Sequence, residues 1–471
     1  MVFSSTVFLF IFLPIVLTIH FLLARNYRNL FLLIASLFFY AWGEHILVLL
    51  MMASICINYI FGIVVWYLGK SERQRWSKLV LTIGVLLNLL MLGYYKYIHF
   101  LLDTLSQVGI KLDVDVSSVV LPIGISFFVF QGISYLIDVY RKIIEGEKSL
   151  INLGMYISLF PQLTAGPIVR YEDIIKEIRS REILFPLFKE GVFRFIGGFA
   201  KKILIANNVG LIADEIFAIQ PNDLSTTLTW IGIVCYTLQI YYDFSGYSDM
   251  AIGLGKMLGF NFKENFDYPY ISKSIREFWR RWHISLSSWF RDYLYIPLGG
   301  NQKGKYRTYV NFLIVFFLTG LWHGASWNFV IWGLFHGFFI IIERLNIIKV
   351  PTRFYVIGNI YTLLIVMIGW VLFRSENLEY AVGFILKMFS FTPGNNNYPY
   401  IFLNKYTFTV LFIGSVLALP LREFIKKKAN FVITNQNIRN ILKQSFFVVL
   451  FILCLMELAQ TTYNPFIYFR F

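Results

Sequence analysis

Long apolar segments follow one another along almost the whole chain, and they constrain its fold more than any other feature. About 20 apolar residues are enough to cross a bilayer as a helix. Only 15% of the 471 residues are charged and the mean hydropathy is +0.63, a composition unlike that of soluble domains of this length. The apolar spans lie near residues 4–23, 29–42, 46–67, 79–101, 118–139, 184–206, 226–242, 308–342, 355–373, 403–420 and 444–460, with shorter stretches near 150–168 and 246–260.

These spans predict an all-α, polytopic membrane protein of about eleven or more helices, with shorter re-entrant and interfacial helices among them. We expect residues 1–471 to form a single integral-membrane domain. The N-terminal sequence MVFSSTVFLFIFLP has no basic residue before its apolar stretch and no small-residue cleavage site. It therefore predicts a retained first helix, not a signal peptide.

The positive charge of the chain indicates how it is oriented in the membrane and does not by itself indicate a nucleic-acid partner. The formal net charge is +15 at pH 7, but Lys and Arg mark the cytoplasmic loops of polytopic proteins. Residues 271–310 contain eight Lys and Arg against two acidic residues, so this segment is predicted to be cytoplasmic. Continuing the alternation from there places the C-terminus outside. Between residues 141 and 270 the charges are mixed, and they fix no number of crossings.

The sequence Trp322-His323-Gly324 interrupts an apolar hairpin at residues 308–342. Each arm is shorter than the roughly 20 residues of a full span, so His323 is predicted to lie within or near the membrane. A histidine at that depth is costly unless it is hydrogen-bonded or used. His323 is therefore either a functional titratable group or a packing residue that donates to a helix carbonyl.

A second candidate site lies in the cytoplasmic segment. Ser274 and Glu277 have the spacing of a capping box, and Pro297 with Gly299-Gly300 supplies a stop, which predicts an interfacial helix over residues 275–293. One face of that helix would carry a cationic stripe. It either anchors the helix to anionic lipid headgroups or binds a phosphate-bearing cytosolic ligand. The stripe consists of Arg276, Arg280, His283 and Arg291, with Arg281 nearby.

Polar residues also interrupt the apolar stretch that begins at residue 226. Gln239, Asp243 and Asp249 must be satisfied inside the protein if they lie at membrane depth. They predict either a structural hydrogen-bond network or the lining of a channel. The three cysteines lie far apart inside apolar spans, and neither an HExxH pair nor a GxxxxGK[ST] loop occurs. No metal site and no permanently bound cofactor are expected.

Several long segments resemble one known family, the bacterial membrane-bound O-acyltransferases (MBOAT). Within it, the chain is most similar to the branch of the alginate O-acetylation protein and the peptidoglycan O-acetyltransferase, and more distantly to the teichoic-acid D-alanylation protein. The segments are MVFSSTVFLFIFLP, RNLFLLIASLFFYAWG, LPIGISFFVFQGISYLIDVYR (121–141), FPQLTAGPIVRY (160–171), YYDFSGYSDMAIGLGKMLGFNFKENFDYPY (241–270), FWRRWHISLSSWFRDYLYIPLGG (278–300) and LTGLWHGASWNFVIWGLFHG (318–337).

The resemblance implies the MBOAT fold in a multi-pass protein of the bacterial inner membrane. It also implies transfer of an acyl group from a cytosolic thioester to an acceptor on the outer side. By motif, His323 takes the place of the family's essential histidine and His283 that of its second one. Tyr468, in the C-terminal tail of residues 461–471, falls in an F-x-Y-x-x-F motif proposed to relay the acyl group. Without the family, the same tail is typical of an interfacial aromatic belt.

The resemblance leads us to expect acetyl-CoA as the donor, with Arg276, Arg280, Arg281 and Arg291 near its phosphates. The expected partners are an extracytoplasmic SGNH-type acetyltransferase or a similar acceptor protein, and membrane lipids. Peptidoglycan is favoured as the final acceptor because the richness in Phe, Ile, Lys and Asn suggests an AT-rich genome. Alginate or another exopolysaccharide is the alternative. A transporter of the polysaccharide or its lipid carrier is the rival class, although no repeated halves are found.

Overall fold

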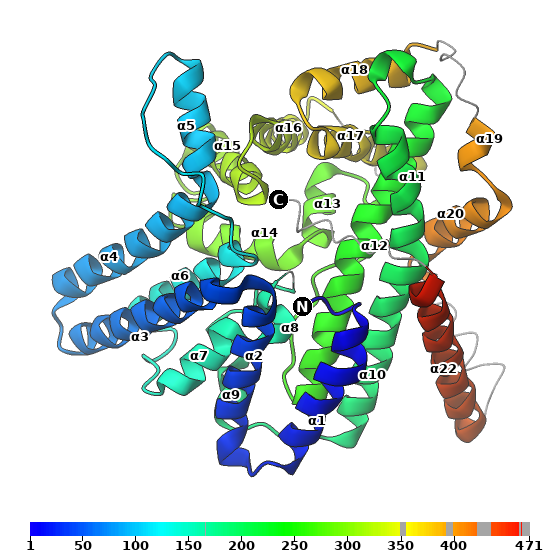
Figure 1. Cartoon of the computed structure of the whole chain (residues 1–471). Helices are drawn as coiled ribbons and strands as arrows, with labels where there is room; N and C mark the ends of the chain where they lie inside the picture. The colour runs from blue at the N-terminus through cyan, green and yellow to red at the C-terminus, as the bar shows by residue number, and fades with distance from the viewer. Residues whose placement is uncertain (165, 349–354, 392–398, 422–434, 461–462, 464–471) are drawn as a thin grey trace. The chain divides into compact units, whose positions relative to one another are not determined.

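The computed structural model describes residues 1–164, 166–348, 355–391, 399–421, 435–460 and 463 (Figure 1). These residues form helices and connecting segments and include no strand, which confirms the all-α prediction. The helical stretches that are long and apolar enough to cross a membrane are Arg25–Lys70, Gln74–Gln107, Phe185–Phe217, Tyr355–Arg374 and Gln436–Gln460. Three shorter helices are also apolar: Phe8–Leu22, Ile125–Tyr140 and Lys405–Leu417.

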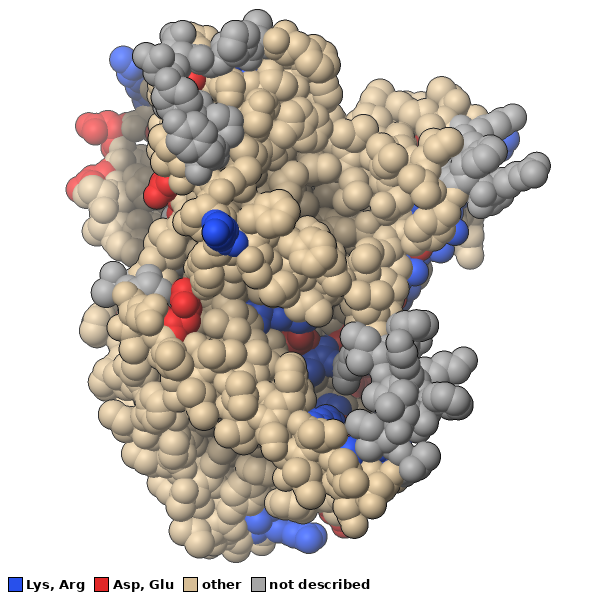
Figure 2. Space-filling view, turned by 90° about the vertical axis from the view of Figure 1, so that its right-hand side faces the viewer, with Lys and Arg blue, Asp and Glu red and all other residues tan. Residues whose placement is uncertain are grey.

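The surface of the described chain fits a lipid environment. On the face that Figure 2 shows, most residues are neither acidic nor basic, and the charged ones form small separate groups. Large apolar side chains such as Phe446 and Ile452 of α22 (Gln436–Gln460) are at least half exposed. Exposure of this kind is unfavourable in water and ordinary against acyl chains. The chain is a membrane protein, while the exact number of crossings stays a prediction.

Contacts divide the chain into two compact units. The single integral-membrane domain stays a prediction. Unit 1 comprises Met1–Val192 and Ala251–Lys263, and unit 2 comprises Phe193–Met250 and the described residues from Glu264 onward. The helices of unit 1 are α1 (Leu13–Leu22), α2 (Arg28–Glu44), α3 (Val48–Lys70), α4 (Gln74–Leu92), α5 (Ile98–Gln107), α6 (Ile125–Tyr140), α7 (Leu150–Ser158), α8 (Phe160–Leu163) and α9 (Tyr171–Arg179).

Polar and small residues join the helices of unit 1. The amides of Asn58 on α3 and Asn88 on α4 are buried and donate to each other at 3.1 Å. Gly132 of α6 lies against Asn58, because a Cβ added there would be 2.4 Å from the amide nitrogen. Buried amide pairs and small residues are the usual means of close helix packing where lipid removes the hydrophobic driving force.

Unit 2 contains the helices that carry the candidate site. Two of its helices, α10 and α12, begin or end in unit 1. The helices are α10 (Phe185–Ala200), α11 (Asn207–Phe217), α12 (Thr226–Leu258), α13 (Ile275–Arg281), α14 (Ile284–Phe290), α15 (Gly304–His323), α16 (Trp327–Arg344), α17 (Tyr355–Arg374), α18 (Leu378–Phe389), α19 (Pro399–Phe402), α20 (Lys405–Leu417) and α22, with π-helical turns at Lys201–Ala206 and Arg291–Tyr295.

The predicted apolar hairpin forms α15 and α16, which meet through glycines. A Cβ on Gly320 would lie 2.2 Å from the carbonyl oxygen of Phe329, and one on Gly333 would lie 2.2 Å from that of Phe316. No side chain fits at either position, so the two backbones can approach closely only because both residues are glycine. This packing fixes the position of His323, the last residue of α15.

Two helix boundaries differ from the sequence prediction. The stretches near 226–242 and 246–260 form one continuous helix, α12. The predicted interfacial helix over residues 275–293 is wrong, because the chain is extended at Trp282 and left-handed at His283 (φ 43°). The capping interaction at its start is present: Ser274 Oγ accepts from the backbone N–H of Glu277 at 3.1 Å.

Candidate active site

Unit 2 brings His283 and His323 together. Their ring centroids lie 6.3 Å apart with the rings inclined at 65°. His283 is fully buried and His323 is 4% exposed. His283 is the residue immediately before α14, and His323 is the last residue of α15. The sequence marked the two histidines separately, and tertiary packing makes them one site.

Aromatic rings enclose His323. Its ring packs edge-on against Trp322, Trp332 and Phe373, with centroid distances of 5.0, 4.9 and 5.3 Å. The chain leaves α15 directly afterwards, because Gly324 is extended and α16 starts at Trp327. A ring packed on several sides keeps one orientation, as general base catalysis requires.

A short backbone ladder holds His283 in its left-handed conformation. The N–H of Asp267 donates to the carbonyl of Arg281, and that of Ile284 donates to the carbonyl of Asn265, both at 2.9 Å. A left-handed residue other than glycine is strained by roughly 1–2 kcal/mol, so flanking bonds must hold it. Burial lowers the pKa of His283 to about 3. The imidazole is therefore neutral at physiological pH and has a lone pair for accepting a proton or a hydrogen bond.

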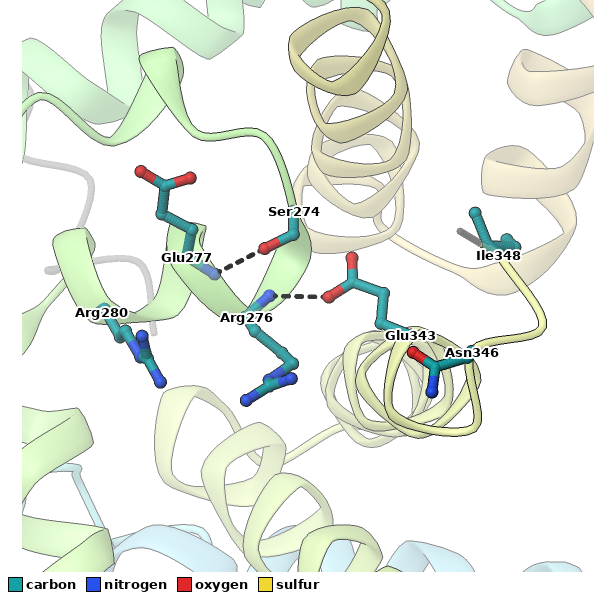
Figure 3. Close-up of a pocket in the computed structure, with 7 residues that line it drawn as sticks. All are labelled: Ser274, Arg276, Glu277, Arg280, Glu343, Asn346 and Ile348. Carbon is teal, nitrogen blue, oxygen red and sulfur yellow. Dashed lines mark hydrogen bonds between the residues drawn. The ribbon is translucent and has the colours of Figure 1, made fainter. Parts of the chain in front are cut away.

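A cavity of about 500 Å³ lies beside α13, the helix that leads to His283. The side chains of Arg276 and Arg280 point in the same direction from this helix (Figure 3). Within the part of the chain that the structure describes, neither guanidinium forms a hydrogen bond or a salt bridge. The lining residues are Ser274, Arg276, Glu277, Arg280, Glu343, Asn346 and Ile348.

Arg281 and Arg291, which were also expected near the donor phosphates, do not line this cavity. Arg281 pairs with Asp267 at 2.8 Å and with Glu277 at 3.0 Å. Arg291 pairs with Asp292 at 2.7 Å. The predicted stripe of Arg276, Arg280, His283 and Arg291 does not lie on one continuous helix, because the chain is extended at Trp282 and left-handed at His283. The role of these arginines in donor binding stays a prediction.

Glu343 lines one side of the cavity and was not singled out from the sequence. Its carboxylate accepts from the backbone N–H of Ile275 at 2.6 Å and from that of Arg276 at 3.1 Å. Burial raises the pKa of Glu343 above its usual range. Because Glu343 satisfies the first amides of α13, Arg276 and Arg280 are the cationic groups that, among the described lining residues, can meet an anion in the cavity. The signal that could have found Glu343 is its place as the one acid at the end of an apolar hairpin arm.

The polar residues of α12 form ion pairs with α10 and the turn after it. Asp243 pairs with Lys202 at 2.6 Å, with both side chains at most 3% exposed. Asp249 pairs with Lys201 at 2.7 Å and with Arg194 at 2.5 Å. Gln239 is also buried. The basic partners were not singled out from the sequence, although Lys201-Lys202 inside an apolar span was the available signal.

Removing one partner of the buried Asp243–Lys202 pair should destabilise the protein strongly. Lys202→Met leaves an uncompensated buried carboxylate, which costs about 3–5 kcal/mol. We expect a lower melting temperature and less monodisperse protein in detergent, with partial recovery in Lys202→Met/Asp243→Leu. Lys256→Met is the matched control, because its partner Glu190 is largely exposed and such pairs contribute about 0–1 kcal/mol. Equal melting temperatures for Lys202→Met and the wild type would contradict this account.

The predicted relay residue Tyr468 lies outside the described residues. Tyr463, closer to α22, is described: its hydroxyl donates to Asp214 at 2.6 Å, and its carbonyl accepts from Asn207 at 3.2 Å. Arg374 pairs with the other oxygen of Asp214 at 2.6 Å. The chain after α22 is thus held at Asp214, near the C-terminal ends of α11 and α17.

Comparisons with known proteins agree on one family. A sequence model of the membrane-bound O-acyltransferase family (MBOAT) matches residues 36–377. The chain is 42% identical over 495 residues to a probable alginate O-acetylase of Pseudomonas putida, covering 100% of both chains. It is 45% identical over 423 residues to the probable alginate O-acetylase of Pseudomonas aeruginosa, covering 88% of this chain and 79% of the relative. It is 34% identical over 418 residues to the peptidoglycan O-acetyltransferase of Helicobacter pylori, covering 81% and 78%.

Proposed function

Because this chain belongs to the membrane-bound O-acyltransferase family, we propose that it moves an acetyl group from cytosolic acetyl-CoA to an acceptor on the other side of the bacterial inner membrane. The protein is an O-acyltransferase of the membrane, as the sequence resemblance predicted. The observation that carries the proposal is the buried pair His283 and His323 at 6.3 Å, with the arginine-lined cavity on the helix that leads to it.

Each part of this arrangement has a role in acetyl transfer. Arg276 and Arg280 bind phosphates of the donor, because a guanidinium matches phosphate oxygens in charge and geometry. His323 is the general base that takes the proton of the attacking hydroxyl. His283 supports it as a second neutral imidazole. The surrounding aromatic rings keep water from hydrolysing the thioester.

Tyr468 suits a relay on chemical grounds. A thiol leaves with a pKa of about 8.5 and a phenol has one of about 10, so moving an acetyl group from the thioester to a tyrosine is near balance. Passing it from the phenyl ester to an aliphatic alcohol then runs downhill. The acceptor is a partner outside the cytoplasm, such as an SGNH-type acetyltransferase, which hands the acetyl group to a polysaccharide. Tyr463, the described residue of the tail, donates its hydroxyl to Asp214 at 2.6 Å.

The relatives favour alginate or a similar exopolysaccharide as the final acceptor over peptidoglycan. The alginate O-acetylases reach 42% and 45% identity, against 34% for the peptidoglycan O-acetyltransferase. The amino-acid composition had favoured peptidoglycan instead, but a compositional bias reflects the genome and not the site.

Deleting the gene and restoring it as wild type or His323→Ala tests the function. We expect O-acetyl groups on the secreted polysaccharide to be lost on deletion and restored only by the wild type. Loss confined to peptidoglycan would reverse the choice of acceptor. Loss of the polymer itself, with normal acetylation of what is still exported, would support a transporter instead.

Arg280→Gln should raise the KM for acetyl-CoA at least tenfold and weaken its dependence on salt, with kcat little changed. A lost charge-assisted hydrogen bond contributes about 1.5–3 kcal/mol to donor binding. Arg291→Gln is the matched control, because Arg291 is paired with Asp292 and lies outside the cavity lining. Initial rates of CoA release over a range of donor concentrations give both constants. Equal donor KM values for the two variants would rule out the cavity as the phosphate site.

A further inference from the structure

Asn265 makes a converging set of hydrogen bonds at His283. Its side-chain oxygen Oδ1 accepts from the backbone N–H of Ser285 at 3.1 Å and from the Ser285 hydroxyl at 2.8 Å. The same oxygen lies 3.2 Å from Nδ1 of His283. The side-chain nitrogen donates to Ser248 Oγ on α12 at 3.1 Å. Asn265 is fully buried.

These contacts fix which way the amide of Asn265 faces. A backbone N–H can only donate, so the atom that meets the N–H of Ser285 must be the oxygen. The atom that meets Nδ1 of His283 is the same oxygen and can only accept. Nδ1 must therefore carry a proton. Ser285 Oγ lies 3.5 Å from Nδ1, too far for a competing strong bond, and its own proton is directed to Asn265.

We propose that Asn265 is a positioning residue that holds the neutral imidazole of His283 in the tautomer with its proton on Nδ1. Nε2 then presents its lone pair as the accepting atom of the candidate active site. This inference rests on the proposed function only for its effect on the reaction, because the tautomer is a property of the resting protein. In acetyl transfer, Nε2 accepts a hydrogen bond from a hydroxyl or from an N–H of a neighbouring ring such as His323.

The surroundings of Asn265 explain why it can set the tautomer. Its neighbour Glu264 pairs with Arg194 at 2.5 Å, and Asp267 pairs with Arg281. The backbone ladder between residues 265–267 and 281–284 adds two further bonds. Asn265 therefore has little freedom to turn away from His283.

The elements around His283 carry several charged and titratable groups, but the amide of Asn265 determines the tautomer of the imidazole. Each carboxylate among these groups forms a salt bridge with a lysine or an arginine. An amide oxygen at Nδ1 fixes the tautomer and adds no negative charge, which would favour the imidazolium form. The titratable and charged groups in this set are Asp243, Asp249, Glu264, Asp267, Arg281 and His323.

The tautomer is measured by NMR of the full-length protein in lipid, labelled with ¹⁵N in the histidine rings. His283→Gln assigns the signals by difference. We expect Nδ1 of His283 to be protonated and Nε2 unprotonated at pH 7. Asn265→Leu should give a mixture of tautomers, whereas Asn328→Leu, which removes another buried asparagine of unit 2, should leave the tautomer unchanged. A proton on Nε2 in the wild type, or one unchanged tautomer in Asn265→Leu, would overturn the proposal.

The reaction gives a second, separable readout. Asn265→Leu should lower kcat about 100-fold with little change in the donor KM, because a misplaced group loses its attack geometry. Asn265→Asp keeps the acceptor but adds a charge, so the acidic limb of the rate profile should move to higher pH. A merely structural role would lower the amount of folded protein in both variants without moving that limb. Absence of acetyl transfer in the wild type would refute the proposed function and leave the NMR result standing.

Discussion

Replacing His323 with alanine should abolish acetyl transfer while leaving the protein folded. His323 is 4% exposed, stands 6.3 Å from His283 between ring centroids, and is enclosed by Trp322, Trp332 and Phe373. Loss of a general base typically lowers the rate by about 10²–10⁴-fold, and loss of the oriented ring adds to this. The measurement is the rate of CoA release in detergent or lipid, normalised to monodisperse protein.

His20 supplies the matched control for this variant. It is a fully buried histidine on α1 that the proposed chemistry does not use. His20→Gln should affect folding or melting temperature but leave the rate per folded molecule near that of the wild type. A His323→Ala protein with near-normal turnover would remove His323 from the mechanism, whatever its effect on stability.

Tyr468→Phe should stop transfer to the outer acceptor while the protein assembles normally. The change keeps an aromatic ring for packing at the interface and removes the hydroxyl that would carry the acetyl group. Tyr468 lies outside the described residues, so this expectation rests on the F-x-Y-x-x-F motif and on the fixed position of Tyr463 at Asp214.

Mass spectrometry of the C-terminal peptide tests this relay directly. After incubation with labelled acetyl-CoA and no acceptor, the wild type should carry a labile acetyl group on Tyr468, and His323→Ala should carry none. Tyr463→Phe loses the bond to Asp214 but keeps the hydroxyl of Tyr468, so it should slow the acetylation of Tyr468 without abolishing it. A fully active Tyr468→Phe protein would show that the acceptor hydroxyl reaches His323 without a relay.

The sequence predicted what depends on local composition. The length of the apolar runs predicted helices, and the apolar runs on either side of His323 predicted a hairpin, which α15 and α16 form. Ser274 and Glu277 marked the start of α13 correctly. These features follow from hydrophobicity and capping within a few turns of chain, so no tertiary information is needed to find them.

The features that were not predicted from the sequence depend on contacts between residues far apart in the chain. The helix expected over 275–293 breaks at Trp282 and His283 because residues 265–267 bond to both sides of the break. Arg276 and Arg280 therefore lie on α13, whereas Arg291 follows α14. The backbone ladder also brings Asn265 to His283, while Glu343 reaches the start of α13 from another helix. Periodicity describes one helix at a time and contains no signal for such contacts.

Acetyl transfer across a sealed membrane is the most direct test of the central claim. Purified protein is reconstituted in liposomes, with labelled acetyl-CoA on one side and the SGNH-type acetyltransferase or a soluble polysaccharide acceptor on the other. We predict label on the acceptor from the wild type, free CoA on the donor side, and neither product from His323→Ala. Label that appears only on the donor side, or equal transfer by both proteins, would contradict the account.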